Sequence, residues 1–81
     1  MVHVGGIVTV IDNEQCYSSY EEWVNRHAPE YRNRWKKHRV PTNGNPYEVV
    51  TIADHEWGNG AIYGIFNKVD GYFVVDVTAF V

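Results

Sequence analysis

Apolar and polar residues alternate with a period of two in four stretches of the chain, which is typical of β-strands. The first stretch follows the pair Gly5-Gly6 and is rich in β-branched residues. The other three lie in the C-terminal half, and their short connections favour an antiparallel meander. The predicted strands cover residues 7–11, 47–54, 61–66 and 72–77. The second face of the strand at 72–77 is only partly polar, so we expect helices to cover it.

The period changes to that of a helix between the first two strands. One apolar stripe at helical spacing consists of Tyr20, Trp23, Val24 and His27. The stretch SSYEE at residues 18–22 has the S-x-x-E spacing of a capping box, which marks the start of a helix. Pro29 cannot lie inside this helix but suits the first turn of another. We therefore predict two short helices, at residues 19–27 and 29–38.

The predicted order is one strand, two helices, a three-stranded meander and a terminal turn. At 81 residues the chain has room for one core, so we expect a single domain over residues 1–81. The fold class is α+β. The layout is that of a small SH3-like antiparallel β-barrel with a two-helix insertion after its first strand.

The chain resembles the short SH3-like proteins of bacteriophages that infect Gram-positive hosts. The resemblance rests on VGGIVTVID leading to YSSYEEW, and on NGNPYEVVTIA leading to DGYFVVDVTAF. It implies a viral protein that binds and modulates or inhibits a host macromolecular machine. The chain is similar also to KOW-type barrels, in which a G-x-x-G-x-V turn begins a strand, although GNPYEVV carries Tyr47 at the second glycine.

Composition excludes several classes of protein. A hydrophobic content of 44% with 15% aromatic residues is too high for a disordered chain. Cys16 is the single cysteine, so no internal disulfide can form. The N-terminal stretch lacks the pattern of a signal peptide, and no stretch has the length of a membrane span. We expect a soluble protein without a membrane partner in the cytoplasm, which is the host cytoplasm if a phage encodes it.

Charge is distributed unevenly along the chain. The formal net charge is −3, yet residues 26–39 carry +5 and the remainder −8. The acidic residues outside this region are spread along the chain, as in an ordinary soluble domain, and do not by themselves indicate mimicry of DNA. The basic residues gather in RNRWKKHR, residues 32–39, which we call the basic segment. Its candidate partner-binding residues are Arg32, Arg34, Lys36, Lys37 and Arg39.

Three interpretations of the basic segment remain open. Its cations could contact phosphates while Trp35 or Tyr31 stacks on a base. They could instead solvate a helix whose aromatic face packs into the core. They could also dock onto an acidic protein, since Arg and Trp are enriched at interface hot spots. The negative net charge disfavours nucleic acid, because nucleic-acid domains are usually basic overall.

Trp57 is a further candidate partner-binding residue. It lies between Glu56 and the glycine-rich stretch 58–60, at the predicted tip of a hairpin. A loop Trp in this position either contacts a partner or folds back over Tyr63 or Tyr47. The sequence leaves both alternatives open.

No pattern predicts metal binding or catalysis. The candidate soft or imidazole ligands are His3, His27, His38, His55 and Cys16, and none has a metal-binding spacing. The adjacent residues Asp54, His55 and Glu56 point to opposite sides of an extended chain. A small buried hydrophobe is the expected role of Cys16. We therefore expect no metal, no cofactor and no enzymatic activity.

The sequence favours a non-enzymatic protein-interaction module that acts as a monomer on a host protein. The alternative is a nucleic-acid-binding SH3-like or KOW-like domain that uses the basic segment as a helix. A third interpretation is an assembly component that associates with itself through an open sheet edge.

Overall fold

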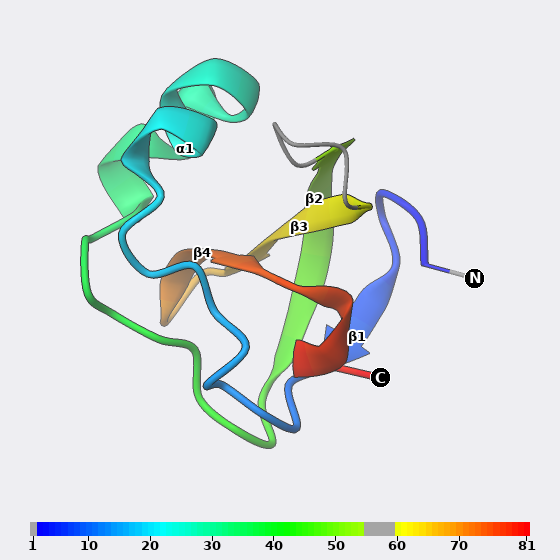
Figure 1. Cartoon of the computed structure of the whole chain (residues 1–81). Coiled ribbons are helices and arrows are strands. Elements are labelled where there is room, and N and C mark those ends of the chain that lie inside the picture. Colours follow the sequence, from blue (N-terminus) through cyan, green and yellow to red (C-terminus); the bar gives the residue numbers. More distant parts are fainter. Residues whose placement is uncertain (1, 55–59) are drawn as a thin grey trace.

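The computed structural model describes residues 2–54 and 60–81. It has four strands, one α-helix and two 3₁₀ helices (Figure 1). In chain order these are β1 Ile7–Thr9, α1 Glu21–His27, η1 Pro29–Arg34, β2 Pro46–Asp54, β3 Ala61–Asn67, β4 Gly71–Val75 and η2 Val77–Ala79. The predicted α+β class, with four antiparallel strands and two short helices after the first, is confirmed.

The four strands form one antiparallel sheet in the order β1-β2-β3-β4. A register shift between Val49 and Thr51 interrupts the pairing of β2 with β3 and bends β2. A second bulge precedes β1, where Gly5 N donates to Val49 O at 2.8 Å and Val49 N donates to Gly6 O at 2.8 Å. Gly5 has a φ of +94°, which an L side chain rarely adopts, so this bulge needs a glycine.

The sheet does not close into a barrel, because β1 and β4 are its two edges and do not pair. The predicted SH3-like barrel is therefore not confirmed. Irregular backbone occupies the gap instead. Tyr17 N donates to Val74 O at 2.7 Å, and Asp76 N donates to Gln15 O at 3.0 Å. Ile11 N donates to Ala79 O at 2.7 Å, so residues 11–17 connect β1, η2 and β4.

Both faces of the sheet are apolar, and each has its own cluster of buried side chains. The inner cluster comprises Val10, Tyr47, Val49, Ile65, Phe73, Val75 and Ala79. The outer cluster joins the sheet to α1 and η1 and comprises Trp23, Val24, Ala28, Trp35, Ile62, Tyr72 and Val74. Successive β4 residues point to opposite clusters, and every residue of β4 is buried. The helices thus cover the second face of β4, as its composition predicts.

The start of α1 differs from the prediction. The helix begins at Glu21, with Tyr20 at the N-cap and no side-chain capping hydrogen bond. The carbonyl of Ser18 accepts from His38 N at 2.7 Å, while that of Ser19 accepts from Glu21 N. The capping-box prediction is wrong: no serine side chain caps the helix, and the Ser18 carbonyl instead binds the backbone of His38, in the chain that follows η1.

The second predicted helix, at residues 29–38, begins at Pro29 as predicted but ends at Arg34. The chain forms only the 3₁₀ helix η1, and Trp35 is already extended, with a ψ of 132°. Beyond Trp35 the segment offers no apolar residue that could hold another helical turn against the sheet, and its neighbouring cations would repel one another on a helix. His38 then takes a φ of 69°, which turns the chain toward β2. The basic segment is therefore 3₁₀-helical only as far as Arg34, and beyond it the backbone is irregular, with a turn at residues 37–38.

The strand ends differ slightly from the predictions. The strand predicted to end at Ile11 stops at Thr9, because Ile11 bonds to η2. The strand predicted to end at Val77 stops at Val75, because the Asp76 carboxylate caps η2 by accepting from Thr78 N. In the described part of the chain, no helix has the length and apolar character needed to cross a bilayer.

Candidate functional site

Trp35 of the basic segment and the preceding Tyr31 pack against the outer cluster. Trp35 is only 4% exposed and belongs to the outer cluster. The Tyr31 ring stacks on Tyr72, with ring centroids 5.0 Å apart, and contacts the Phe66 ring at 5.1 Å. Trp35 is therefore not available to stack on a nucleic-acid base, and Tyr31 already stacks on Tyr72.

Three of the five predicted cations make contacts within the protein. Arg32 forms an ion pair with Glu21, with Nη2 and Oε2 2.5 Å apart. Arg34 donates from Nη2 to the Lys68 carbonyl at 2.7 Å. Arg39 lies over the Phe73 ring, 5.5 Å from its centroid. These contacts fasten the basic segment to α1 and to the sheet.

Lys36 and Lys37 are different. Both are exposed, and neither forms an ion pair with any described residue. They are the cations of the segment most available to an external partner. Trp57, the other predicted contact, lies outside the described residues, as do His55 and Glu56.

The helices cover only part of the outer face of the sheet. Ile62, Tyr72 and Val74 of β3 and β4 are buried beneath α1 and η1. Figure 1 shows the helices above this half, whereas β1 lies away from them. Ile7, Glu48 and Phe66 are cross-strand neighbours in one row that runs out from under the helices: Phe66 packs against the outer cluster, whereas Glu48 and Ile7 are exposed. Ile7 is 67% exposed, which is unusual for a large apolar residue in a strand.

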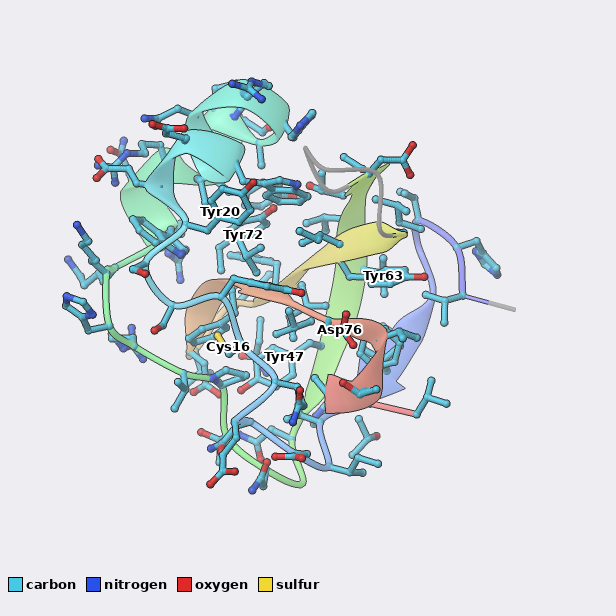
Figure 2. The ribbon with its side chains drawn as sticks, viewed as in Figure 1. Cys16, Tyr20, Tyr47, Tyr63, Tyr72 and Asp76 are labelled. Atoms are coloured by element: carbon cyan, nitrogen blue, oxygen red, sulfur yellow. The ribbon has the colours of Figure 1, made fainter. Side chains whose placement is uncertain are left out.

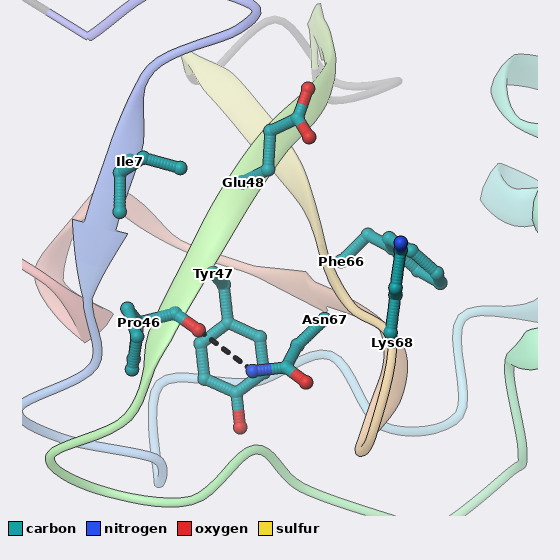
Figure 3. Close-up of a pocket in the computed structure, with 7 residues that line it drawn as sticks. All are labelled: Ile7, Pro46, Tyr47, Glu48, Phe66, Asn67 and Lys68. Atoms are coloured by element: carbon teal, nitrogen blue, oxygen red, sulfur yellow. Dashed lines mark hydrogen bonds between the residues drawn. The ribbon is translucent and has the colours of Figure 1, made fainter.

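A surface groove of about 310 Å³ lies at the boundary between the two halves (Figure 3). We call it the sheet groove, and it is lined by Ile7, Pro46, Tyr47, Glu48, Phe66, Asn67 and Lys68. Ile7 and Phe66 supply apolar walls, while Glu48 and Lys68 add one charge of each sign. The volume suits one or two side chains of a partner and is at the lower limit for a small-molecule pocket.

Local hydrogen bonds keep the sheet groove in shape. Asn67 Nδ2 donates to the Pro46 carbonyl at 2.9 Å, which joins β3 to β2 across the floor (Figure 3). Asn67 Oδ1 accepts from Val69 N at 2.8 Å and so orders the turn after Lys68. The Arg34 guanidinium lies 5.1 Å from the centroid of the Phe66 ring. This contact brings one end of the basic segment to the wall of the groove.

The titratable groups nearby have structural partners. Tyr47, which is labelled in Figure 2, donates from Oη to Asp70 Oδ2 at 2.5 Å, and this bond, with a second from Asn45, lowers the pKa of Asp70. Burial and the same carboxylate raise the pKa of Tyr47. Burial raises the pKa of Cys16 to about 11, so its thiol stays protonated near neutral pH. These groups therefore stabilise the fold and offer no activated nucleophile.

The described part of the chain contains no cluster of side chains that could hold a metal ion. Within residues 2–54 and 60–81, no three His, Cys, Asp or Glu side chains come together as a metal ion requires.

Most residues of the sheet groove are absent from the sequence predictions. Ile7, Glu48, Phe66 and Lys68 come from three strands or their ends, and only the strand register brings them together. One sequence signal was available. Because Val8 and Val10 point to the inner cluster, the alternation places Ile7 on the other face, where a surface strand normally carries a polar residue.

No family model, curated protein or solved structure matches the chain.

Proposed function

We propose that this chain is a non-enzymatic protein-interaction module that binds its partner through the sheet groove and the adjoining basic segment. One observation carries the proposal: the helices leave the outer sheet face uncovered at β1 and the start of β2, and a groove with exposed Ile7 lies there. A monomeric domain of this size usually buries such a face.

The chemistry of the surface supports a protein partner. Burying an Ile side chain in an interface contributes about 1.5–3 kcal/mol, and aromatic and Arg side chains are common at hot spots. Phe66 with Arg34 above it supplies that combination beside Ile7. Lys36 and Lys37 add exposed positive charge that would attract an acidic partner.

The proposal includes an SH3-like fold and a host protein as the partner. Support for the fold comes from residues 11–17 and η2, whose hydrogen bonds fill the gap between β1 and β4 where a barrel would close. The host partner follows from the resemblance to phage SH3-like proteins, and binding would modulate or inhibit the machine to which that partner belongs.

Nucleic-acid binding by the basic segment remains the second candidate. Exposed Lys36, Lys37 and Arg39 favour it. The burial of Trp35 and the stacking of Tyr31 on Tyr72 disfavour base stacking, so phosphate contacts would dominate. Affinity would then fall by about 0.7–0.9 log units per log unit of salt for each phosphate contacted.

The experiment is capture of partners from bacterial lysate, with and without nuclease, comparing wild type with three variants. Ile7→Glu places a charge in the groove, and Lys36→Glu with Lys37→Glu reverses the exposed cations. Val81→Glu is the matched control, because Val81 is 75% exposed and lies outside the groove. We expect a protein retained by wild type in both arms, with about 10- to 100-fold weaker binding for Ile7→Glu, since the apolar contact is lost.

Val81→Glu should bind as wild type does, and the double Lys variant should bind more weakly. Equal retention by wild type and Ile7→Glu would contradict the assignment of the groove. Retention that disappears with nuclease would instead support the nucleic-acid alternative.

A further inference from the structure

The outer edge of β1 carries backbone groups without a partner in the sheet. Gly6 O accepts from Val49 N, and Val10 N donates to Asn45 O, so the even-numbered residues face β2. In an antiparallel ladder the residues between them point the other way. The N–H and C=O groups of Ile7 and Thr9 therefore face away from the sheet. Thr9 lies opposite Pro46, which has no N–H to donate, in agreement with this register.

Most of the usual protections of an edge strand are missing here. Natural edge strands are guarded by charged side chains, proline or covering segments. Residues 4–11 contain no charged residue and no proline. The bulge at Gly5 limits the open edge on one side, and the bond from Ile11 N to Ala79 O limits it on the other. Between these limits, Ile7 and Thr9 are both exposed.

We propose that this edge pairs with the same edge of a second copy of the chain, in an antiparallel arrangement centred on Val8. Ile7 of each copy then lies opposite Thr9 of the other, and each of these two pairs exchanges both N–H···O bonds. The arrangement has two-fold symmetry, as most homodimers do. The absence of charge in residues 4–11 allows two copies to approach without like-charge repulsion at the seam.

The dimer has a consequence for the sheet groove. A two-fold axis perpendicular to the sheet keeps the same face of both copies on one side. The Ile7 side chain gains Thr9 of the second copy as a neighbour, and two grooves open on one continuous sheet. The ladder is short, so the dimer is weak and depends on concentration.

The test measures molar mass by light scattering and sedimentation equilibrium from micromolar to millimolar protein. For wild type, we expect the mass to rise from 9.4 kDa toward twice that value. Thr9→Pro removes an outward N–H without breaking a bond to β2, since proline is tolerated at such edge positions. This variant should remain monomeric. Thr9→Val keeps the N–H and the β-branched shape, so it should associate as wild type does.

Circular dichroism and thermal unfolding check that both variants fold. A wild-type mass that stays at 9.4 kDa throughout would overturn the proposal, even if a strand from another protein were found on the edge. Equal association by Thr9→Pro and wild type would overturn it too, and so would loss of association in Thr9→Val. If Thr9→Pro does not fold, amide hydrogen exchange of the wild type replaces it. Exchange at Ile7 and Thr9 must then slow as concentration rises, and unchanged rates would overturn the proposal.

Discussion

At the scale of single residues, Tyr47 joins more parts of the molecule than its place in β2 requires. Its ring packs edge-on against Phe73 in the inner cluster, with centroids 5.8 Å apart. Its hydroxyl donates to Asp70 Oδ2 and accepts from Thr42 N at 2.9 Å. The residue thus ties the turn before β2 to the turn before β4, and it is also one of the residues that line the sheet groove.

The first prediction concerns Tyr47→Phe. Loss of the hydroxyl should lower the free energy of unfolding at neutral pH by about 1 kcal/mol, because both of its partners are near solvent and can bond to water. Tyr63→Phe is the control, since Tyr63 is half-buried and its hydroxyl makes no hydrogen bond to a described residue. Urea unfolding measures both variants. Equal losses would contradict the role assigned to the Tyr47 hydroxyl.

The hydrogen bond from Tyr47 to Asp70 predicts how the free energy of unfolding changes with pH in the acid range. The Tyr47 and Asn45 hydrogen bonds lower the folded pKa of Asp70 below its ordinary value of 3.8. The ionised carboxylate therefore stabilises the fold above pH 3.8, and this contribution is lost as pH falls through the lower folded pKa. Without the hydroxyl the pKa of Asp70 lies nearer 3.8, so Tyr47→Phe should lose less stability than wild type below pH 4. Urea unfolding across the acid range gives the comparison, and parallel acid profiles would contradict it.

At the scale of elements, the strands and α1 could be predicted because their patterns match one structural period. Alternation places Phe73 and Val75 on one face of β4 and Tyr72 and Val74 on the other, and the structure buries both sets. The end of η1 could not be predicted in this way. Tyr31 and Trp35 have helical spacing, yet Trp35 reaches the outer cluster from extended backbone. A spacing of four residues fits either geometry, and only the tertiary contact decides between them.

Gly71 controls how closely η1 approaches β4. Its φ is +105°, and a Cβ there would lie 2.6 Å from the Arg34 carbonyl oxygen. Gly44 has a similar φ of +89°, but a Cβ would meet no atom within 4 Å. Comparing substitutions at Gly44 and Gly71 therefore distinguishes the cost of an unfavourable backbone angle from the cost of forcing η1 and β4 apart. The close approach of η1 to β4 matters for the site, because Arg34 also covers Phe66.

We predict that Gly44→Ala lowers the free energy of unfolding by about 1–2 kcal/mol, from the unfavourable backbone angle alone. Gly71→Ala should cost about 1–3 kcal/mol more, because the methyl group overlaps the Arg34 carbonyl. Chemical denaturation of the two variants and wild type gives the difference directly. Equal costs would mean that η1 moves away from β4 without loss, which would contradict the packing described here.

At the scale of the whole molecule, the candidate site lies on the part of the outer sheet face that α1 and η1 do not cover. The sequence shows that β4 receives the helices, but it does not show how far a layer of two short helices extends across the sheet. Ile7 and Lys68 are 61 positions apart in the sequence and meet only through the register of β1, β2 and β3. The basic segment was visible in the sequence, whereas the contacts of Arg32, Arg34 and Arg39 depend on the folded chain.

Irregular backbone fills the gap between β1 and β4, and its stability can be tested by amide hydrogen exchange. Ile11, Asp12 and Tyr17 donate to Ala79 and Val74 across the gap between β1 and β4. If these bonds are part of the cooperative fold, the three amides exchange only through global unfolding, at the rate of a central amide such as Val49. Ile7 and Thr9 are the internal controls, because their amides face outward and should exchange fast in dilute protein. Exchange at Ile11 and Tyr17 as fast as at Ile7 would mean that the gap opens independently of the sheet. Slow exchange there would instead make residues 11–17 a structural substitute for the missing pairing between β1 and β4, leaving the outer edge of β1 as the open one.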